Sequence, residues 1–179
     1  MLSRKSLAVL GGALVLLASP VAVGPAAAAG PNPAGAGQSL AASGWLIHTF
    51  NGKCVEVENS GTGNGDRVQQ WDCVGQAGAV WYGEWQGEYE YIKNSNSGKC
   101  LEVENSGTGN GDRVQQWDCV GQAGAKWYPV NAGNGYVYFK NHHSGKCLEV
   151  ENSGYSNGAR IQQWDCVGQA GSKFYTTAA

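Results

Sequence analysis

A carboxylate, an amide and an indole recur at matched positions three times along this chain of 179 residues. The copies span 53–73, 99–119 and 146–166, and the first two differ at one position, Val55 against Leu101. A carboxylate accepts hydrogen bonds from adjacent hydroxyl groups, and an indole offers a flat apolar face. These groups together suit a sugar, whose ring has an apolar face and a rim of hydroxyls. The candidate residues are Glu56, Gln69 and Trp71 (site 1), Glu102, Gln115 and Trp117 (site 2), and Glu149, Gln162 and Trp164 (site 3).

The residues around these groups alternate between apolar and polar, which predicts half-buried strands. In the first copy Val55 and Val57 share one face of a strand, and Glu56 lies on the other. Segment 60–66 is dense in Gly, Asn and Ser and predicts a turn, and segment 67–73 predicts a second strand. Each copy is therefore expected to form a β-hairpin.

Six cysteines mark the ends of the three copies, each first cysteine being followed by a second 19 residues later. An even number of cysteines in a chain with a secretory signal indicates disulfides. A thiolate metal site is the weaker interpretation, because the sequence contains no C-x-x-C spacing. The repeat predicts one symmetric pairing, in which each bridge adds about 3 kcal/mol to the free energy of unfolding. The predicted bridges are Cys54–Cys73, Cys100–Cys119 and Cys147–Cys166.

The bridges also suggest a register for each hairpin. If Cys54 and Cys73 face each other across an antiparallel pair, Glu56 lies opposite Trp71. One further step places Glu58 opposite Gln69. The alternative interpretation is structural, because a partly buried Trp beside a solvated Glu also repeats in a threefold barrel.

The third copy differs from the others inside its turn. Ala159 stands where the first two copies have Asp66 and Asp112. Tyr155 stands where those copies have Thr62 and Thr108. If the three copies share one role, the Asp and Thr side chains are not essential to it.

A period of 46 to 47 residues fits a propeller blade, a solenoid or one third of a β-trefoil. No segment shows the i, i+3, i+4 apolar spacing of a helix, so we predict an all-β chain. Three disulfide-closed hairpins are too few for a propeller and suit a threefold barrel, so the predicted fold is a β-trefoil. The predicted domain covers residues 44–179, with repeats at approximately 45–90, 91–136 and 137–179.

The first 29 residues have the features of a secretory signal peptide. Arg4 and Lys5 precede the apolar run 7–18, and small residues follow up to a predicted cleavage near Ala29. Residues 30–43 are then expected to form a flexible leader. These features predict a secreted protein that does not insert into a membrane.

Charge and motifs exclude several function classes. Loss of the two basic residues with the signal changes the formal net charge from -2 to -4, which argues against nucleic acid as a partner. Asp72 falls on the opposite strand face from Glu56, so the two do not form a glycosidase acid pair. Segment 58–66 is rich in oxygen side chains but lacks EF-hand spacing, and His142-His143 is one isolated pair. We expect no catalytic residue, cofactor or metal, and we expect a monomer.

The segment SGKCLEVENSGTGNGDRVQQWDCVGQAGAKW resembles the ricin B-type lectin repeat, which is also carbohydrate-binding module family 13. The resemblance rests on the paired cysteines, the two strands and a closing aromatic residue (Trp81, Trp127 and Phe174), and it covers Gly44 to Tyr175. It implies a β-trefoil that binds galactose-type or xylan-type glycans or polysaccharide. In that family the stacking aromatic matches Trp71, Trp117 and Trp164, and the supporting Gln matches Gln69, Gln115 and Gln162.

Two family positions differ here. The family usually has Asp where this chain has Glu56, Glu102 and Glu149, and it usually has an Asn-Gln pair before the closing aromatic. This chain has Gly78-Ala79, Gly124-Ala125 and Gly171-Ser172 at that pair. We hypothesise that the Gln two residues before each pair restores the missing amide, which adds Gln76, Gln122 and Gln169 to sites 1, 2 and 3.

A protein-binding trefoil, such as an inhibitor or a toxin-like interaction module, is the alternative. Such proteins act through loops that differ between repeats, here Gly83–Tyr91 and Asn141–Gly145. The near-identity of the copies favours three equivalent small-ligand sites.

Overall fold

The computed structural model describes residues 44–179, so the predicted signal peptide and leader lie outside the described residues. The described chain is a β-trefoil, as predicted, and contains no α-helix. In this part of the chain there is also no helix long and apolar enough to cross a membrane. The strands are β1 (Trp45–Thr49), β2 (Cys54–Val57), β3 (Val68–Trp71), β4 (Val80–Trp85), β5 (Glu90–Asn94), β6 (Cys100–Val103), β7 (Val114–Trp117), β8 (Lys126–Gly133), β9 (Tyr136–Asn141), β10 (Cys147–Val150), β11 (Ile161–Trp164) and β12 (Phe174–Ala178).

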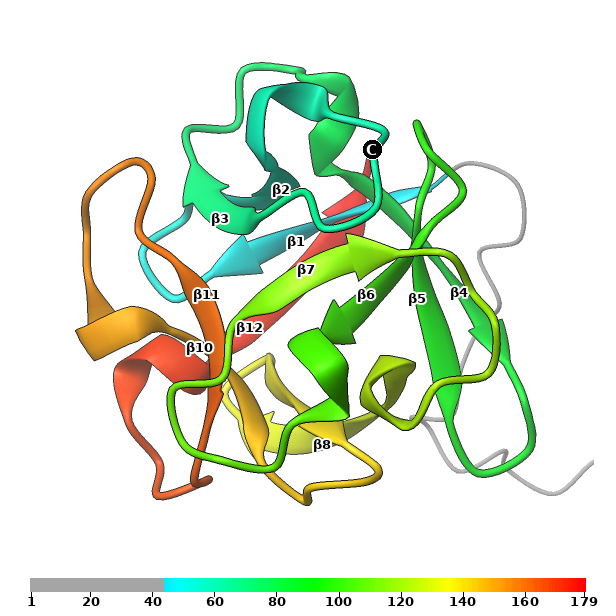
Figure 1. Cartoon of the computed structure of the whole chain (residues 1–179). Coiled ribbons are helices and arrows are strands. Elements are labelled where there is room, and N and C mark those ends of the chain that lie inside the picture. Colours follow the sequence, from blue (N-terminus) through cyan, green and yellow to red (C-terminus); the bar gives the residue numbers. More distant parts are fainter. Residues whose placement is uncertain (1–43) are drawn as a thin grey trace, which may run out of the picture. The chain divides into compact units, whose positions relative to one another are not determined.

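Six of these strands close a barrel, and the other six form three hairpins at one end (Figure 1). Around the barrel β1 pairs with β4, β4 with β5, β5 with β8, β8 with β9, β9 with β12, and β12 with β1. The hairpins are β2–β3, β6–β7 and β10–β11. A closed barrel leaves no unpaired sheet edge. The first strand of each hairpin also pairs with the barrel strand before it.

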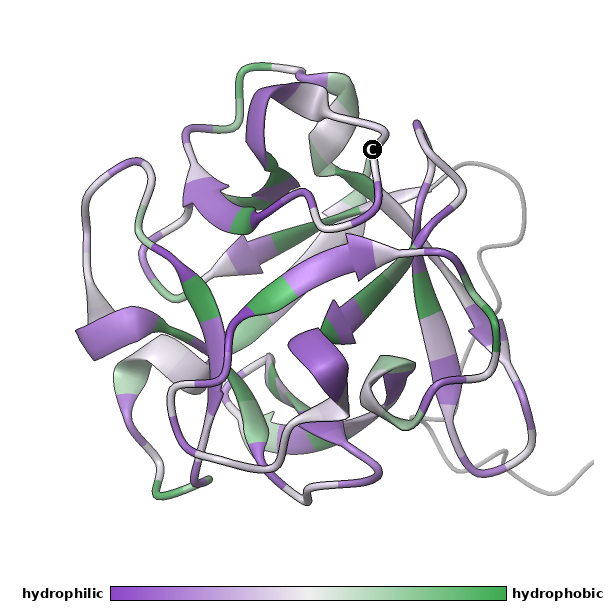
Figure 2. Cartoon of the chain, in the orientation of Figure 1, coloured by the Kyte–Doolittle hydropathy of each residue, from purple (hydrophilic) through white to green (hydrophobic). Residues whose placement is uncertain are grey.

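The core fills the barrel and the space under the hairpins. Hydrophobic and hydrophilic residues alternate along the strands (Figure 2), and the hydrophobic ones point inward, as for Leu101, Val103 and Val114, which are fully buried. The closing aromatics Trp81, Trp127 and Phe174 are fully buried as well. Since the buried indole N–H needs an acceptor, Trp81 donates to the carbonyl of Val55 at 2.8 Å.

The three predicted disulfides are confirmed. Cys54–Cys73, Cys100–Cys119 and Cys147–Cys166 each close one hairpin, with Cα–Cα distances of 5.2, 5.3 and 5.2 Å. In each repeat the chain makes two single-turn 3-10 helices, one between the two strands of the hairpin and one after its second strand. They are η1 (Glu58–Ser60), η2 (Ala77–Ala79), η3 (Glu104–Ser106), η4 (Ala123–Ala125), η5 (Glu151–Ser153) and η6 (Ala170–Ser172).

Buried glutamines join each repeat to the next. The Nε2 of Gln116 donates to the carbonyls of Gly61 and Gly63, at 2.9 and 3.0 Å, in the turn of the preceding repeat. Its Oε1 accepts a hydrogen bond from the hydroxyl of Ser97 at 2.7 Å. Gln163 holds the turn of the second repeat in the same way, and Gln70 holds the turn of the third. The three glutamines therefore close a ring of contacts between the repeats.

Gln116→Ala should lower the free energy of unfolding by about 2 to 3 kcal/mol, because the fully buried amide makes hydrogen bonds to two carbonyls and a hydroxyl that would all be lost. Urea unfolding with the disulfides intact measures this loss. Gln86→Ala is the matched control, since Gln86 is exposed and its loss should cost at most about 0.5 kcal/mol. Equal effects of the two changes would contradict the role of the ring.

One acidic side chain is buried in the barrel wall. Glu90 pairs in register with Trp85 and Trp127 and is 6% exposed. Its carboxyl occupies the space beside Gly83, where a Cβ would lie only 2.3 Å from Oε2. Burial raises the pKa of Glu90 from 4.5 to about 7.

A raised carboxyl pKa disfavours the ionised form in the folded state. The stability from Glu90 should therefore be fully present below pH 4.5 and lost as the pH rises to about 7. The loss should be about 3 kcal/mol and should disappear in Glu90→Gln. Thermal unfolding between pH 5 and 8 tests this, with Glu88→Gln as the exposed control. An unchanged pH profile in Glu90→Gln would refute the assignment.

Candidate functional site

The register of the hairpins differs from the sequence prediction by two residues. Glu56 lies opposite Gln69, and Cys54 lies opposite Trp71, so the prediction of Glu56 opposite Trp71 was wrong. Glu58 does not pair with Gln69 either, because it has left the strand and begins η1. The reason is that Cys73 lies two residues beyond the end of β3 and folds back to reach Cys54. The other two hairpins have the same register.

The carboxylate and the amide of each hairpin lie side by side and are almost fully buried. Glu56 and Gln69 are 5% and 3% exposed, and the Nε2 of Gln69 donates to Oε1 of Glu56 at 2.9 Å. In site 3 the Nε2 of Gln162 donates to Oε2 of Glu149, also at 2.9 Å. At site 1 the amide thus holds one carboxylate oxygen of Glu56, and the other oxygen is left for a further donor.

An arginine fixes the orientation of this amide. Arg67 forms an ion pair with Glu58, and its Nη2 also donates to Oε1 of Gln69 at 3.2 Å. Because the amide oxygen faces the guanidinium, the amide NH2 must face Glu56. Arg113 and Arg160 repeat the arrangement at sites 2 and 3.

The indole beside this buried pair is open to solvent. Trp71, Trp117 and Trp164 are each 39% exposed. At site 1 Trp71 borders a shallow cavity of about 210 Å³, and all four predicted residues of the site line it. The residues that line it are Glu56, Asn59, Ser60, Gln69, Trp71, Val74 and Gln76.

Three of these lining residues were not among the predicted site residues. Asn59 and Ser60 belong to η1 and adopt left-handed backbone angles, with φ of 55° and 51°. Val74 is 73% exposed, which is unusual for a large apolar side chain. All three residue types recur in the other copies, and that repetition was the available signal.

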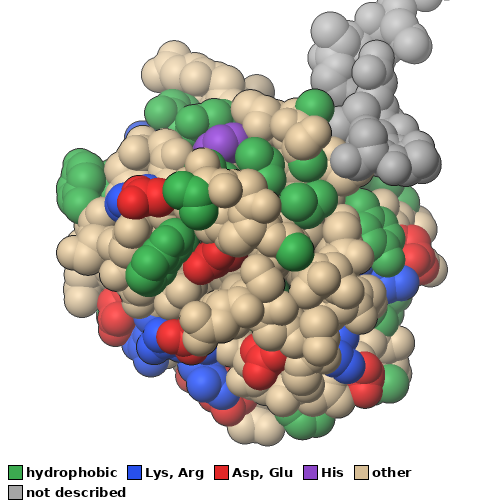
Figure 3. Space-filling view, turned by 90° about the horizontal axis from the view of Figure 1, so that it is seen from above, with side chains coloured by type: hydrophobic (Ala, Val, Ile, Leu, Met, Phe, Trp, Pro, Cys, Tyr) green, Lys and Arg blue, Asp and Glu red, His purple; other side chains and the backbone are tan. Residues whose placement is uncertain are grey.

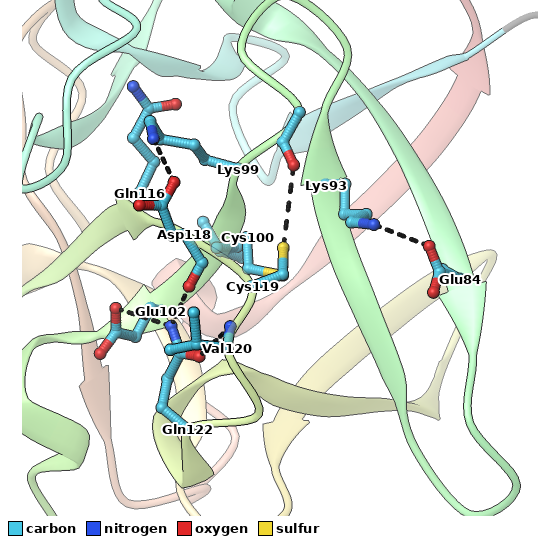
Figure 4. The surroundings of a disulfide bond; sticks show 12 residues. Glu84, Lys93, Lys99, Cys100, Glu102, Gln116, Asp118, Cys119, Val120 and Gln122 are labelled. Carbon is cyan, nitrogen blue, oxygen red and sulfur yellow. Dashed lines mark hydrogen bonds and ion pairs between the residues drawn. A yellow bond between two sulfur atoms is a disulfide. The ribbon is translucent and has the colours of Figure 1, made fainter.

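The glutamine after each hairpin makes its shortest hydrogen bonds to the backbone of its own loop. Gln76 accepts a hydrogen bond from the backbone N–H of Val74 and donates to the carbonyl of Asp72, both at 2.9 Å. In site 2 the corresponding residue is Gln122, and its amide also donates to Oε2 of Glu102 at 3.3 Å (Figure 4). Gln169 and Glu149 make the equivalent contact at 3.4 Å. The geometry makes these glutamines positioning residues for the loop and, in sites 2 and 3, for the carboxylate.

The glycines at the usual Asn position have a steric reason. A Cβ on Gly78 would lie 2.7 Å from the carbonyl oxygen of Val57 and 2.9 Å from Cα of Ser60. The N–H of Gly78 donates to the hydroxyl of Ser60 at 2.9 Å. Here η1 and η2 pack too closely for any side chain at position 78, and Ser60 takes that space at the cavity.

Each site is also bordered by the turn of the preceding repeat. A Cβ on Gly65 would lie 3.7 Å from Cζ3 of Trp117, and Gly111 lies next to Trp164 in the same way. At the remaining boundary Gly158 of the third repeat lies beside Trp71 of the first. Each site is therefore built from two repeats.

Comparison with known proteins agrees with this architecture. Residues 80–164 match the family model of the ricin-type β-trefoil lectin domain-like proteins. A designed threefold-symmetric protein, ThreeFoil, is 31% identical, with a TM-score of 0.73 over 75% of this chain and 98% of that one. The chain belongs to the ricin-type β-trefoil lectin family. No curated protein sequence matched.

Other solved ricin-type and related trefoil structures share the fold at lower identity. An agglutinin from Abrus precatorius is 24% identical, with a TM-score of 0.62 over 74% of this chain and 47% of that one. An exo-β-1,3-galactanase from Clostridium thermocellum is 24% identical, with a TM-score of 0.74 over 77% of this chain and 30% of that one. At these identities the likeness extends to the fold alone.

The contact between Gln122 and Glu102 gives a measurable shift. Burial raises the pKa of the Glu102 carboxyl, and the hydrogen bonds from Gln122 and Gln115 oppose that rise. Gln122→Ala removes a bond to the charged form, so the pKa of Glu102 should rise further. An NMR titration of the labelled Glu102 carboxyl measures this pKa in the wild-type protein and in Gln122→Ala. A pKa that stays unchanged or falls would exclude Gln122 as a partner of Glu102.

Proposed function

We propose that this protein is a secreted lectin with three shallow sugar sites, centred on Trp71, Trp117 and Trp164. The observation that carries the proposal is an exposed indole beside a nearly buried carboxylate in a small cavity. A buried carboxylate is costly unless donors satisfy it, and the internal donors described for Glu56 reach only one of its oxygens. Sugar hydroxyls would supply the donors for the other.

Binding would use both faces of the ligand ring. The apolar face of a pyranose would lie on the indole of Trp71, and its hydroxyls would donate to Glu56. The fixed amide of Gln69 keeps this carboxylate in place before the ligand arrives, which reduces the entropy lost on binding. Galactose-type and xylan-type sugars are the classes to test first.

Binding without catalysis is part of the proposal. Glycoside hydrolysis needs two carboxyl groups on either side of the scissile bond. Of the described residues that line the site 1 cavity, only Glu56 is acidic. Asp72 lies outside it, in an ion pair with Lys53 and a hydrogen bond from Asn157.

Three sites on one rigid barrel favour a repeating or clustered glycan. Each shallow site is expected to bind weakly, and simultaneous contacts raise the overall affinity without any new interaction. A monomer is sufficient for this effect, because the ring of repeats already separates the three sites.

Protein binding is a second candidate, and one feature favours it. The loops that differ between repeats bring together Tyr89, Tyr128 and His142, with Lys126 over the ring of Tyr89 at 5.0 Å. Trp85 on the same hairpin is 47% exposed. Exposed aromatic residues of this kind are common in protein interfaces.

A glycan array on the oxidised protein tests the main proposal. Trp117→Ala should weaken binding in part, and the triple change of Trp71, Trp117 and Trp164 to Ala should abolish it. Trp85→Ala is the matched control, because it removes an exposed Trp outside the three sites. A triple variant that folds and still binds glycans would contradict the stacking model. A blank array for the folded wild-type protein, with binding to a protein partner that Trp85→Ala weakens, would favour the second candidate.

A further inference from the structure

The boundary between the third and first repeats differs from the other two. The turn of the third repeat has Tyr155 where the other turns have Thr62 and Thr108. The loop that faces this turn also differs, because it has Phe50 where the matching loops have two polar residues, Ser95-Asn96 and His142-His143. The two changes meet in space, since the rings of Tyr155 and Phe50 contact edge to face at 5.2 Å between centroids.

This turn lies against site 1. The N–H of Gly158 donates to the carbonyl of Gln70 at 2.9 Å. A Cβ on Gly158 would lie 4.0 Å from Cζ3 of Trp71. The side chain of Asn157 donates to Oδ2 of Asp72 at 2.8 Å. Tyr155 is three residues from Gly158, and three residues of extended chain span at most about 10 Å.

The ring of Tyr155 is exposed to solvent, but a neighbouring ring favours one orientation for it. Its side chain is 71% exposed, so burial explains little of its presence. Phe50, which packs against the core, contacts it in an edge-to-face geometry and so favours one ring orientation. On the face that Figure 3 shows, hydrophobic side chains lie at the surface beside acidic and basic ones. An oriented exposed ring of this kind is a ready stacking surface.

Polar groups separate the two aromatic rings. From Trp71 the surface passes through Asp72 and Asn157 to Ser156 and then Tyr155, and all five residues are exposed. Two aromatic surfaces with hydrogen-bonding groups between them match an oligosaccharide, in which apolar ring faces alternate with hydroxyls. A continuous apolar segment of a protein would exclude water from Asp72 and Asn157, and their remaining polar atoms would gain no hydrogen bond in exchange.

We propose that site 1 binds an oligosaccharide, with one sugar ring on Trp71 and a later ring of the same chain on Tyr155. Sites 2 and 3, whose bordering turns carry Thr62 and Thr108, bind a single sugar ring. This inference rests on the proposed function. It makes the three sites unequal in ligand length, although their central residues are the same.

Single-site proteins separate the contributions. Trp117→Ala with Trp164→Ala leaves site 1, and Trp71→Ala with Trp164→Ala leaves site 2. NMR titrations of each protein give its dissociation constants for galactose and β-1,3-galactotriose, and for xylose and xylotriose. The length preference is the ratio of the monosaccharide constant to the trisaccharide constant. In the series that binds, the preference for the trisaccharide should be about two- to tenfold larger at site 1 than at site 2.

Two exchanges of the turn residue test the role of Tyr155. Tyr155→Thr should reduce the length preference of site 1 to that of site 2 and leave monosaccharide binding unchanged. Thr62→Tyr, in the turn that borders Trp117, should add part of the preference to site 2, because Phe50 has no counterpart there.

The outcomes distinguish this inference from the proposed function. Binding that depends on Trp71, with equal length preference at both sites or with no effect of Tyr155→Thr, would overturn the inference and leave the proposed function standing. A wild-type protein that binds neither sugar series would overturn the galactose-type and xylan-type proposal, and this inference with it.

Discussion

The ring of hydrogen bonds between repeats is the constraint on which the molecule depends. A hairpin of four-residue strands has too little buried surface to be stable alone. Here each hairpin places a fully buried Gln against backbone carbonyls of the preceding turn, and the third turn closes on the first hairpin. The side-chain NH2 of this Gln donates to two carbonyls of the turn at once, so it selects the turn conformation in which both carbonyls face it. The ring therefore fixes both the barrel closure and the shape of three surface turns.

Fold and candidate function share these turns. The turn held by Gln116 also borders Trp117, so ring closure places part of the wall of the next site. This coupling explains why the copies are so alike, because a change in a turn affects its own hairpin and the neighbouring site. It also explains where variation is tolerated. Asp66 accepts a hydrogen bond from Gln116 at 3.1 Å, whereas Ala159 leaves Gln70 to backbone carbonyls and Asn51.

Much of the fold could be predicted because it follows from local patterns. The alternation in CLEV and VQQW gives strands, the glycine-rich segment gives a turn, and the equal spacing of the cysteines gives the disulfides. The register was mispredicted because a disulfide was assumed to join directly opposed residues. Cys73 instead lies beyond its strand, where the chain is free to turn back, so the bridge carries no information about which residues pair.

Local sequence patterns were enough to predict three like hairpins, their disulfides, the β-trefoil class and the residue types of the candidate sites. Three features appear only in the folded chain: Glu56 pairs with Gln69, Asn59 and Ser60 complete the cavity, and Gly158 lies beside Trp71. The physical reason is the range of the interactions. Alternation and turn chemistry act between neighbours in sequence, whereas each site is completed by packing between segments of different repeats, which no single copy of the repeat records.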